Sequence, residues 1–352
     1  MRLEFAPYLL KFKQPAGTSR GVMTEKPTFL IKIYNEKEPE RFGIGEAAVF
    51  PGLSPEADGN YVWKLTELMA NVALGHPTDL SRHPSIQFGF EQALLDYSNG
   101  CKGIYYPTLF TEGEEFIEIN GLVWMGNFDE MLERLEKKIK AGFKCIKIKI
   151  GAIDWKKEIE LIRRIRNRYG DAELMIRVDA NGGFTYEECH KKLKELAVMG
   201  VHSIEQPIKA GNPELMTKLC KESPVAIALD EELIGKGTTE EKIETLERIR
   251  PQYIILKPAL CGGFSGAVEW IEEARKREIG WWITSALESN VGLNAIAQFA
   301  VSLKVKGPQG LGTGGLFTNN FETPIKLIGD RLTFDKFKYF DYSQFADLKW
   351  HK

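Results

Sequence analysis

The chain has 352 residues, 43% of them hydrophobic, and its 47 basic and 49 acidic residues leave a formal net charge of −2. This length exceeds that of one small domain and suits a barrel with a second unit. No long basic stripe with interleaved aromatic residues is present, so we expect no nucleic-acid partner.

The five cysteines lie far apart without a CxxC pair. That pattern argues against a disulfide framework or a thiolate zinc site, and it fits a reducing compartment. The N-terminus lacks the apolar core of a signal peptide, and no apolar run approaches the length needed to span a membrane. We therefore expect a cytoplasmic protein with no membrane partner, and the sequence does not specify an oligomeric state.

Residues 1–115 have the pattern of an α+β unit, with strands followed by helices. LEFAPYLLKF (3–12) and TFLIKIYNE (28–36) alternate in polarity as antiparallel strands do. Helical periodicity follows in residues 60–75 and 84–100, and each of these segments closes on a glycine, which is a common helix stop.

From residue 116 to residue 319, short apolar runs alternate with amphipathic helical patterns, which predicts βα units and a parallel sheet. The eight candidate strands are centred on FIEING (116–121), CIKIKI (145–150), LMIRVDA (174–180), VHSIEQP (201–207), VAIALDE (225–231), QYIILKP (252–258), WWITSAL (281–287) and QGLGTGG (309–315). Eight strands favour a (β/α)-type barrel over a doubly wound open sheet, because no GxGxxG turn follows the first strand. The tail no longer alternates, and its aromatic residues are expected to pack back on the N-terminal unit.

Three acidic residues end three successive candidate strands: Asp179 in MIRVDAN, Glu205 in HSIEQP and Asp230 in AIALDEE. Taken singly, each is better explained as a helix N-cap or a solvated loop residue. Their near-even spacing of 26 and 25 residues instead places them together at the carboxyl ends of adjacent strands, where barrels carry their chemistry. Three converging carboxylates favour Mg²⁺ over Ca²⁺ or Zn²⁺, with Mn²⁺ as the alternative.

Lys147 and Lys149 stand two apart in KCIKIKIG, so they share one face of their strand. In an edge strand both would be solvated, but in a barrel strand the intervening isoleucines meet the helices and the lysines point inward. Two ammonium groups this close should lower a lysine pKa towards the working range, and Lys149, nearer the carboxyl end, is predicted as the base. Lys257 in YIILKPA ends the sixth strand and is expected opposite Lys149, paired with Asp230 or Glu231.

Other polar positions are expected around this group. Arg177 shares the inward face of the third strand, either as a buried counter-charge below the metal, which we favour, or as a substrate contact. The glycine-rich segments CGGF (261–264) and GLGTGG (310–315) follow strands six and eight, where barrels often hold an anion on backbone N–H groups. With Ser285 in ITSALES, these segments are predicted to form a polar wall opposite Lys149.

The set KIK, VDAN, IEQP, LDE and LKP at these spacings resembles the enolase superfamily, in its muconate-lactonizing-enzyme-like branch, over nearly the whole chain. The resemblance implies an α+β capping domain at residues 1–115, completed by residues 320–352, and a (β/α)7β TIM-type barrel at residues 116–319. Members of this superfamily pair a lysine or histidine base with Mg²⁺ that stabilises an ene-diolate. Within the branch, LKPALCGG, TSALESNVGLNAIAQ and GLGTGGLFTNN are similar to the o-succinylbenzoate synthase family of menaquinone biosynthesis.

The resemblance also implies a role for each matching residue. The implied Mg²⁺ ligands are Asp179, Glu205 and Asp230. The implied reaction-centre lysines are Lys149, Lys257 and Lys147. Lys149 matches the base that also acts as the acid, and Lys257 matches the lysine that stabilises the enolate from the opposite face. The expected substrate contacts are Ser285, Asn181, Gly312 and Thr313, and the expected supporting residues behind the ligands are Glu231 and Arg177.

The implied reaction is Mg²⁺-dependent syn loss of water from a small-molecule carboxylate, 2-succinyl-6-hydroxy-2,4-cyclohexadiene-1-carboxylate, through an ene-diolate to 2-succinylbenzoate. The nearest rival is an N-succinylamino-acid racemase or dipeptide epimerase of the same superfamily, in which Lys149 and Lys257 are bases on opposite faces. A dipeptide epimerase typically carries a DxD-type motif in the eighth-strand loop, and GLGTGG has no aspartate. A Schiff-base aldolase that uses Lys257 is a further alternative, but it assigns no role to the three carboxylates. A non-catalytic barrel is the last alternative; it predicts that one or more strand-end residues are missing, whereas all are present.

The capping domain is expected to close over the barrel mouth. Its moving parts are predicted at Thr18–Thr24 and Phe50–Gly59, because both segments are rich in turn residues. These segments are expected to contact the succinyl tail of the substrate.

Overall fold

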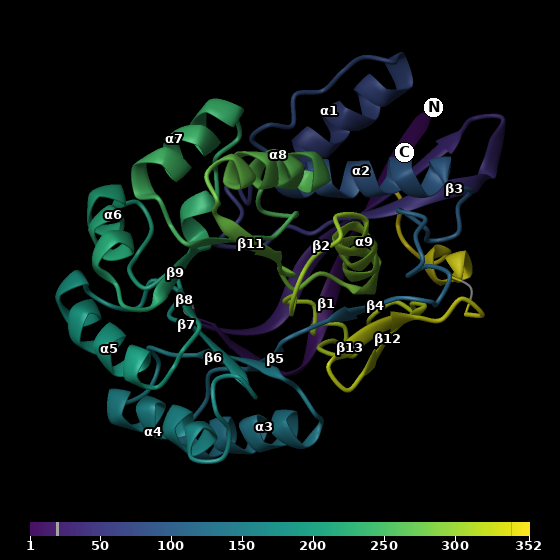
Figure 1. Cartoon of the computed structure of the whole chain (residues 1–352). Coiled ribbons are helices and arrows are strands. Elements are labelled where there is room, and N and C mark those ends of the chain that lie inside the picture. Colours follow the sequence, from purple (N-terminus) through teal and green to yellow (C-terminus); the bar gives the residue numbers. More distant parts are fainter. Residues whose placement is uncertain (19–20, 339) are drawn as a thin grey trace.

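The structure is a computed structural model that describes residues 1–18, 21–338 and 340–352. Its strands form an N-terminal antiparallel sheet, a seven-stranded parallel sheet and a small third sheet. Figure 1 shows the parallel sheet as a curved ring, with helices outside it and the two termini close together on one side.

The bounds of the elements follow the chain. The N-terminal sheet contains β1 (Arg2–Thr18), β2 (Gly21–Asn35) and β3 (Glu38–Ala47). The parallel sheet contains β5 (Gly121–Val123), β6 (Cys145–Lys149), β7 (Met175–Asp179), β8 (Ser203–Glu205), β9 (Ala226–Leu229), β10 (Tyr253–Leu256) and β11 (Gly280–Ile283). The third sheet contains β12 (Ile325–Ile328), β13 (Arg331–Phe334) and β4 (Phe116–Glu118).

The helices are α1 (Tyr61–Leu74), α2 (Pro84–Ser98), α3 (Phe128–Lys140), α4 (Trp155–Arg166), α5 (Tyr186–Val198), α6 (Pro213–Glu222), α7 (Thr239–Ile249), α8 (Gly263–Lys276) and α9 (Asn290–Ser302). Two short 3-10 helices are η1 (Glu231–Leu233) and η2 (Tyr342–Phe345). In the described part of the chain, no helix combines the length and the apolar character needed to cross a membrane.

The parallel strands close into a ring, which confirms the predicted (β/α)7β barrel. Neighbouring strands run in sequence order from β5 to β11. Residues 309 and 310 join the two ends, because Ile119 bridges Gln309 and Thr284 bridges Gly310, both in parallel. Gln309 and Gly310 are therefore the eighth strand, reduced to isolated bridges between the first and the seventh strand of the barrel.

One strand prediction was wrong in detail. The segment FIEING (116–121), predicted as a single barrel strand, is divided between β4, which pairs with β13 in the third sheet, and β5, which pairs with β6 in the barrel. The partner of β4 lies more than 200 residues further along the chain, so no local sequence pattern predicts this pairing.

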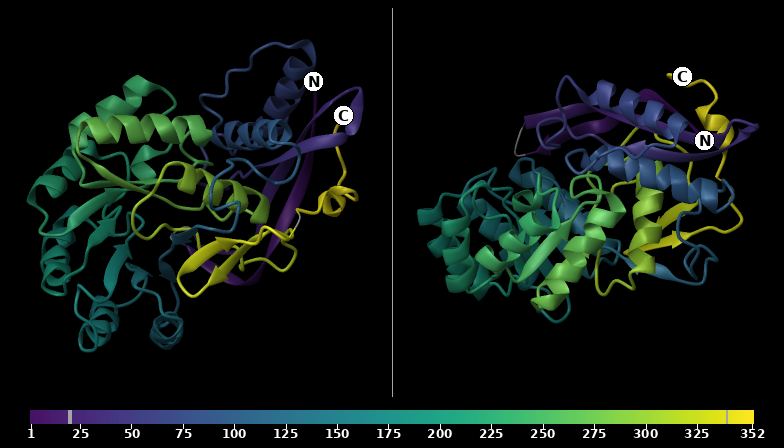
Figure 2. Two further views of the ribbon diagram at one scale, coloured as in Figure 1. Left: turned by 45° about the vertical axis from the view of Figure 1, so that its right-hand side comes forward. Right: turned by 90° about the horizontal axis from the view of Figure 1, so that it is seen from above.

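The N-terminal sheet lies as a layer across one end of the barrel (Figure 2). Helix α2 packs on β3 at very short range, because glycines stand at the contact: a Cβ at Gly45 would lie 2.0 Å from the carbonyl oxygen of Gly89. The C-terminal tail returns to this layer, as predicted. Its residues Phe321, Phe340 and Phe345 form a buried cluster with Leu30 of β2 and Ile44 of β3. The domain boundaries predicted at residues 115 and 320 stay a proposal.

Candidate active site

A pocket opens at the carboxyl ends of the barrel strands, under the N-terminal layer. It is lined by Lys147, Lys149 and Lys257 from the barrel and by Phe50 and Leu53 from the segment after β3. The barrel side of this pocket is charged and the side facing the N-terminal layer is apolar, an arrangement typical of small-molecule sites.

Residues in or next to the two predicted moving segments of the capping domain line the pocket. Phe50 and Leu53 belong to the predicted segment Phe50–Gly59, and Gly17, which also lines the pocket, directly precedes the other predicted segment, Thr18–Thr24. Residues 19 and 20 of that second segment lie outside the described residues.

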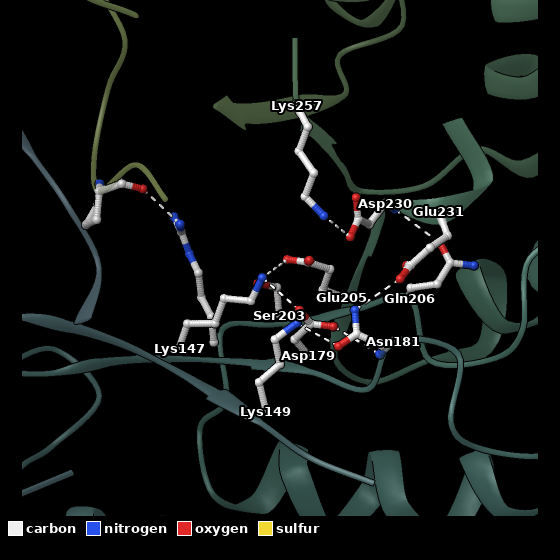
Figure 3. A network of polar contacts seen from close by, with 12 residues as sticks. Lys147, Lys149, Asp179, Asn181, Ser203, Glu205, Gln206, Asp230, Glu231 and Lys257 are labelled. Atoms are coloured by element: carbon white, nitrogen blue, oxygen red, sulfur yellow. Dashed lines mark hydrogen bonds and ion pairs between the residues drawn. The ribbon is translucent and has the colours of Figure 1, made fainter. Parts of the chain in front are cut away.

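Three lysines and three carboxylates form one network at the pocket floor (Figure 3). Lys149 Nζ donates to Asp179 Oδ2 and to Asn181 Oδ1, both at 2.6 Å. Lys147 Nζ lies 2.6 Å from Glu205 Oε2 and 2.8 Å from Asp179 Oδ2. Lys257 Nζ pairs with Asp230. The register of the strands produces this group, because Lys149 stands opposite Asp179 on β7, and Asp179 opposite Glu205 on β8.

Burial and neighbouring charges compete in setting the pKa values of these groups. Burial raises the pKa of Glu205, and the neighbouring charge of Asp179 adds to the rise. Burial would also raise the pKa of Asp179, but the ammonium groups of Lys147 and Lys149 hold it well below its usual range. At Lys257, burial lowers the pKa, while Asp230 and Glu205 more than compensate and leave it raised.

The expectation that adjacent ammonium groups would lower a lysine pKa is wrong for Lys147. Burial does act in that direction, but the charges of Asp179 and Glu205 outweigh it, so the pKa of Lys147 is raised. The physical reason is distance: both carboxylates lie within 2.8 Å of the Lys147 ammonium group. At such a separation, attraction to two opposite charges exceeds repulsion from one like charge.

The chemistry of the carboxylates fits a hard dication. Asp179, Glu205 and Asp230 are at most 2% exposed, and Glu205 Oε1 has no hydrogen-bond partner among the described residues. Lysines hold one oxygen of each ligand residue, and Asp179 Oδ1 accepts from the Asn181 N–H at 3.0 Å. Within the described ranges, no three or more His, Cys, Asp or Glu side chains form a metal-binding group as they stand. The metal role of these three residues therefore stays a prediction, supported by an oxygen-only donor set and one unused buried oxygen.

The two predicted supporting residues, Glu231 and Arg177, lie in different places. Glu231 lines the pocket beside the network, where its Oε1 accepts at 3.0 Å from Nδ2 of Asn181, a predicted substrate contact that also lines the pocket. Arg177 is 6% exposed and lies beneath, where its Nη1 donates to the carbonyl of Pro308 at 2.8 Å and its guanidinium lies 3.9 Å from the ring centre of Trp282. Arg177 is absent from the pocket lining, in keeping with the favoured role as a buried counter-charge.

The polar wall opposite Lys149 forms in part as predicted. Ser285, Gly312 and Thr313 all line the pocket. The segment CGGF (261–264) does not line the pocket, so the prediction that it belongs to the wall was wrong. Its backbone is engaged by a carboxylate of the chain itself, because Phe264 N–H donates to Glu91 Oε2 at 2.5 Å across the contact between α8 and α2.

Sequence reasoning missed two polar residues of the wall, Asn120 and Thr284. Both line the pocket, and their side-chain oxygens Oδ1 and Oγ1 are buried without a hydrogen-bond partner among the described residues. The signal was available, since each stands close to the carboxyl end of a candidate strand, in FIEING and ITSAL. The same strand-end argument that selected the carboxylates would have selected them.

Comparisons with known proteins agree with this geometry. The family described as "Enolase C-terminal domain-like" matches residues 130–323. An o-succinylbenzoate synthase of Desulfotalea psychrophila is 42% identical, over 94% of this chain and 98% of that protein. The crystal structure of MenC from the same organism superposes with a TM-score of 0.84 and 39% identity, over 95% of this chain and 99% of that one.

A more distant relative has a different activity in its name. The L-Ala-D/L-Glu epimerase of Bacillus subtilis is 27% identical, over 63% of this chain and 60% of that protein. Its substrate-bound structure shares the fold with a TM-score of 0.79, over 95% of this chain and 96% of that one. From the matched family and the 42% identical relative, the chain belongs to the enolase superfamily.

Proposed function

We propose that the protein is an o-succinylbenzoate synthase, which removes water from 2-succinyl-6-hydroxy-2,4-cyclohexadiene-1-carboxylate in menaquinone biosynthesis. The observation that carries the proposal is the pair Lys149 and Lys257, which approach the carboxylates from opposite sides of one pocket (Figure 3). The near full-length identity of 42% to a synthase supports this reaction over others of the superfamily.

Lys149 performs both proton transfers, and Lys257 supplies positive charge. Lys149 removes the proton from the carbon next to the substrate carboxylate, and Lys257 stabilises the negative charge of the ene-diolate from the other side. Protonated Lys149 then donates to the departing hydroxyl group on the same face, which gives syn elimination and an aromatic ring. Asp179 and Asn181 orient Lys149 Nζ for both transfers, because each accepts a hydrogen bond from it at 2.6 Å.

Asp179, Glu205 and Asp230 would hold Mg²⁺. When bound, the ion would supply positive charge that stabilises the ene-diolate and disfavours the charged form of the neighbouring lysines. A set made only of carboxylate oxygens is suited to Mg²⁺, and Mn²⁺ is accepted by the same ligands.

The test is ultraviolet turnover of the cyclohexadiene carboxylate with Mg²⁺, with and without EDTA. We expect metal-dependent loss of the diene absorbance, its abolition by EDTA and its recovery when excess Mg²⁺ is added. Calorimetric titration with Mg²⁺ is the second readout, and the Asp230→Asn variant should bind the ion more weakly.

The two catalytic lysines also permit a racemase or epimerase reaction, with one base on each face. A folded protein that binds Mg²⁺, leaves the diene unchanged and exchanges the α-proton of an N-succinylamino acid or a dipeptide would overturn the synthase proposal in favour of this alternative.

A further inference from the structure

A second charged group is buried behind the pocket wall, outside the network of the catalytic lysines. Lys26 on β2, Glu46 on β3 and Glu288, between β11 and α9, are all 0% exposed. Lys26 Nζ and Glu288 Oε1 have no hydrogen-bond partner among the described residues. Buried charges are normally paired and hydrogen-bonded, so this arrangement calls for a reason other than packing.

Glu288 controls two hydroxyl groups of the pocket wall. Its Oε2 accepts from Ser285 Oγ at 2.6 Å and from the Ala286 N–H at 2.7 Å. Ser285 Oγ in turn accepts from Thr313 Oγ1 at 2.8 Å and from the Leu287 N–H at 3.0 Å. A hydroxyl group has one proton and two lone pairs, so Ser285 is saturated and its proton points away from the pocket, towards Glu288.

The direction of these hydrogen bonds depends on the charge of Glu288. As a carboxylate, Glu288 can only accept hydrogen bonds. Ser285 Oγ then donates to Glu288, and Thr313 Oγ1 donates to Ser285 Oγ. If Glu288 were protonated, it would donate to Ser285, the chain would reverse, and the Thr313 proton would be released towards the pocket. The same wall would then present a donor where it now presents an acceptor.

Two charged groups from the N-terminal sheet face Glu288. Burial raises the pKa of Glu288 and Glu46 adds to the rise, whereas the hydrogen bond from Ser285 and the charge of Lys26 oppose it. Glu46 is itself held by the first turn of α9, where Ser289 Oγ donates to it at 2.6 Å and the Gly292 N–H at 3.0 Å. Lys26 Nζ lies 6.0 Å from the ring centre of Phe50, which lines the pocket.

We propose that Glu288 and Lys26 are positioning residues: ionised Glu288 fixes the direction of the Thr313–Ser285 hydroxyl pair, and Lys26, delivered by the N-terminal sheet, keeps Glu288 ionised. The inference rests on the proposed function only for the substrate used in the assay. The interaction between Lys26 and Glu288 does not depend on which reaction the protein catalyses. It makes the hydrogen-bonding character of the pocket wall depend on a lysine that touches neither substrate nor catalytic residues.

The central variant is Lys26→Met, assayed for kcat and KM between pH 6 and pH 9. Without Lys26, the pKa of Glu288 should rise further, because the charge of Lys26 opposes the rise that burial causes. We expect KM for the cyclohexadiene carboxylate to rise about tenfold at pH 6, as befits one charged hydrogen bond, and to return towards the wild-type value at pH 9. The value of kcat should change much less, because Lys149 and Lys257 are untouched.

Matched variants separate this role from a loss of packing. The double variant Lys26→Met/Glu288→Gln cannot titrate at residue 288 and should lose the pH dependence of KM. Lys242→Met removes another buried lysine, 2% exposed and paired with Glu269, and should keep the wild-type pH profile. An unchanged profile in Lys26→Met, or a pH dependence that persists in the double variant, would overturn the proposal.

Two further readouts keep the test decisive. If Lys26→Met does not fold, Glu288→Asp keeps the charge but is too short to reach Ser285, so KM should rise at every pH, and an unchanged KM would refute the role of Glu288. If the wild type itself has no synthase activity, the proposed function fails, but the electrostatics remain testable by urea unfolding. The decrease in the free energy of unfolding caused by Lys26→Met should then become larger from pH 5 to pH 8. The same substitution made in a Glu288→Gln background should show no such dependence on pH.

Discussion

At the scale of single residues, the pocket floor is governed by buried charges that satisfy one another. Lys147, Lys149 and Lys257 each contact at least one of the strand-end carboxylates. Removing one partner of a buried pair leaves an uncompensated charge, which affects stability as well as chemistry. Activity and folding must therefore be measured together for any variant at these positions.

We predict that Lys149→Ala lowers kcat by about 10²–10⁴-fold, the contribution of a positioned acid or base. The exposed Lys144, which directly precedes β6, provides the control, and Lys144→Ala should keep wild-type turnover. Circular dichroism should show both variants folded. Substantial turnover in a folded Lys149→Ala variant would remove this lysine from the mechanism.

Lys257→Ala tests the other lysine. We predict that it also lowers kcat, because the ene-diolate loses a stabilising charge. Exchange of the substrate α-proton with deuterated water proceeds through the same ene-diolate, so it should slow in parallel with turnover. Unchanged turnover in a folded Lys257→Ala variant would remove Lys257 from the mechanism.

At the scale of elements, the N-terminal layer depends on the contact of α2 with β3. Three glycines, Gly43, Gly45 and Gly89, leave no room for a Cβ at this contact. Gly45 is the clearest case, because an added Cβ would lie 2.0 Å from a backbone oxygen of α2, which cannot move without displacing the helix.

We predict that Gly45→Ala lowers the free energy of unfolding by about 1–3 kcal/mol, the usual effect of overpacking. Gly59→Ala is the matched control, because a Cβ there would meet no atom within 4 Å, and it should change stability by less than about 0.5 kcal/mol. Urea unfolding measures both values. Equal stability of the two variants would contradict the close approach of helix and sheet.

At the scale of the whole molecule, Asp96 on α2 joins distant parts of the chain. Its carboxylate accepts from the Ile44 N–H of β3 at 2.9 Å, from the Gly103 N–H at 2.8 Å and from the hydroxyl of Tyr342 near the C-terminus. Burial raises the pKa of Asp96 to about 6, against an ordinary value of 3.8, although these hydrogen bonds oppose the shift. The folded protein therefore binds a proton here more tightly than the unfolded chain.

The raised pKa predicts the sign of a pH effect. The stabilising contribution of protonated Asp96 is complete below about pH 3.8 and is lost as the pH rises through about 6. The free energy of unfolding of the wild type, taken relative to Asp96→Asn, should fall by up to about 3 kcal/mol between pH 4 and pH 8. Urea unfolding at several pH values measures this difference, and a value that stays level or rises with pH would be evidence against it.

Local signals in the sequence account for much of the molecule. The alternation of short apolar runs with amphipathic helices identified the barrel, and the strand-end spacing brought Asp179, Glu205 and Asp230 to one place. These features can be predicted from the sequence because strands and helices repeat their side-chain pattern every two and every 3.6 residues, and because neighbouring βα units place their strand ends side by side. The sequence by itself therefore determined the fold class, and it identified part of the pocket lining, including Lys147, Lys149 and Lys257.

Only the tertiary structure decided what those residues meet. The ring closes through two residues, Gln309 and Gly310, that form no regular strand of their own. The segment CGGF receives Glu91 from α2, more than 160 residues earlier in the chain. Lys26 approaches Glu288 from the N-terminal sheet, and the carboxylates reverse the shift expected at Lys147. The reason is common to all of these features: contact and charge act through space at a few ångströms, whereas a local pattern reports only on neighbours along the chain.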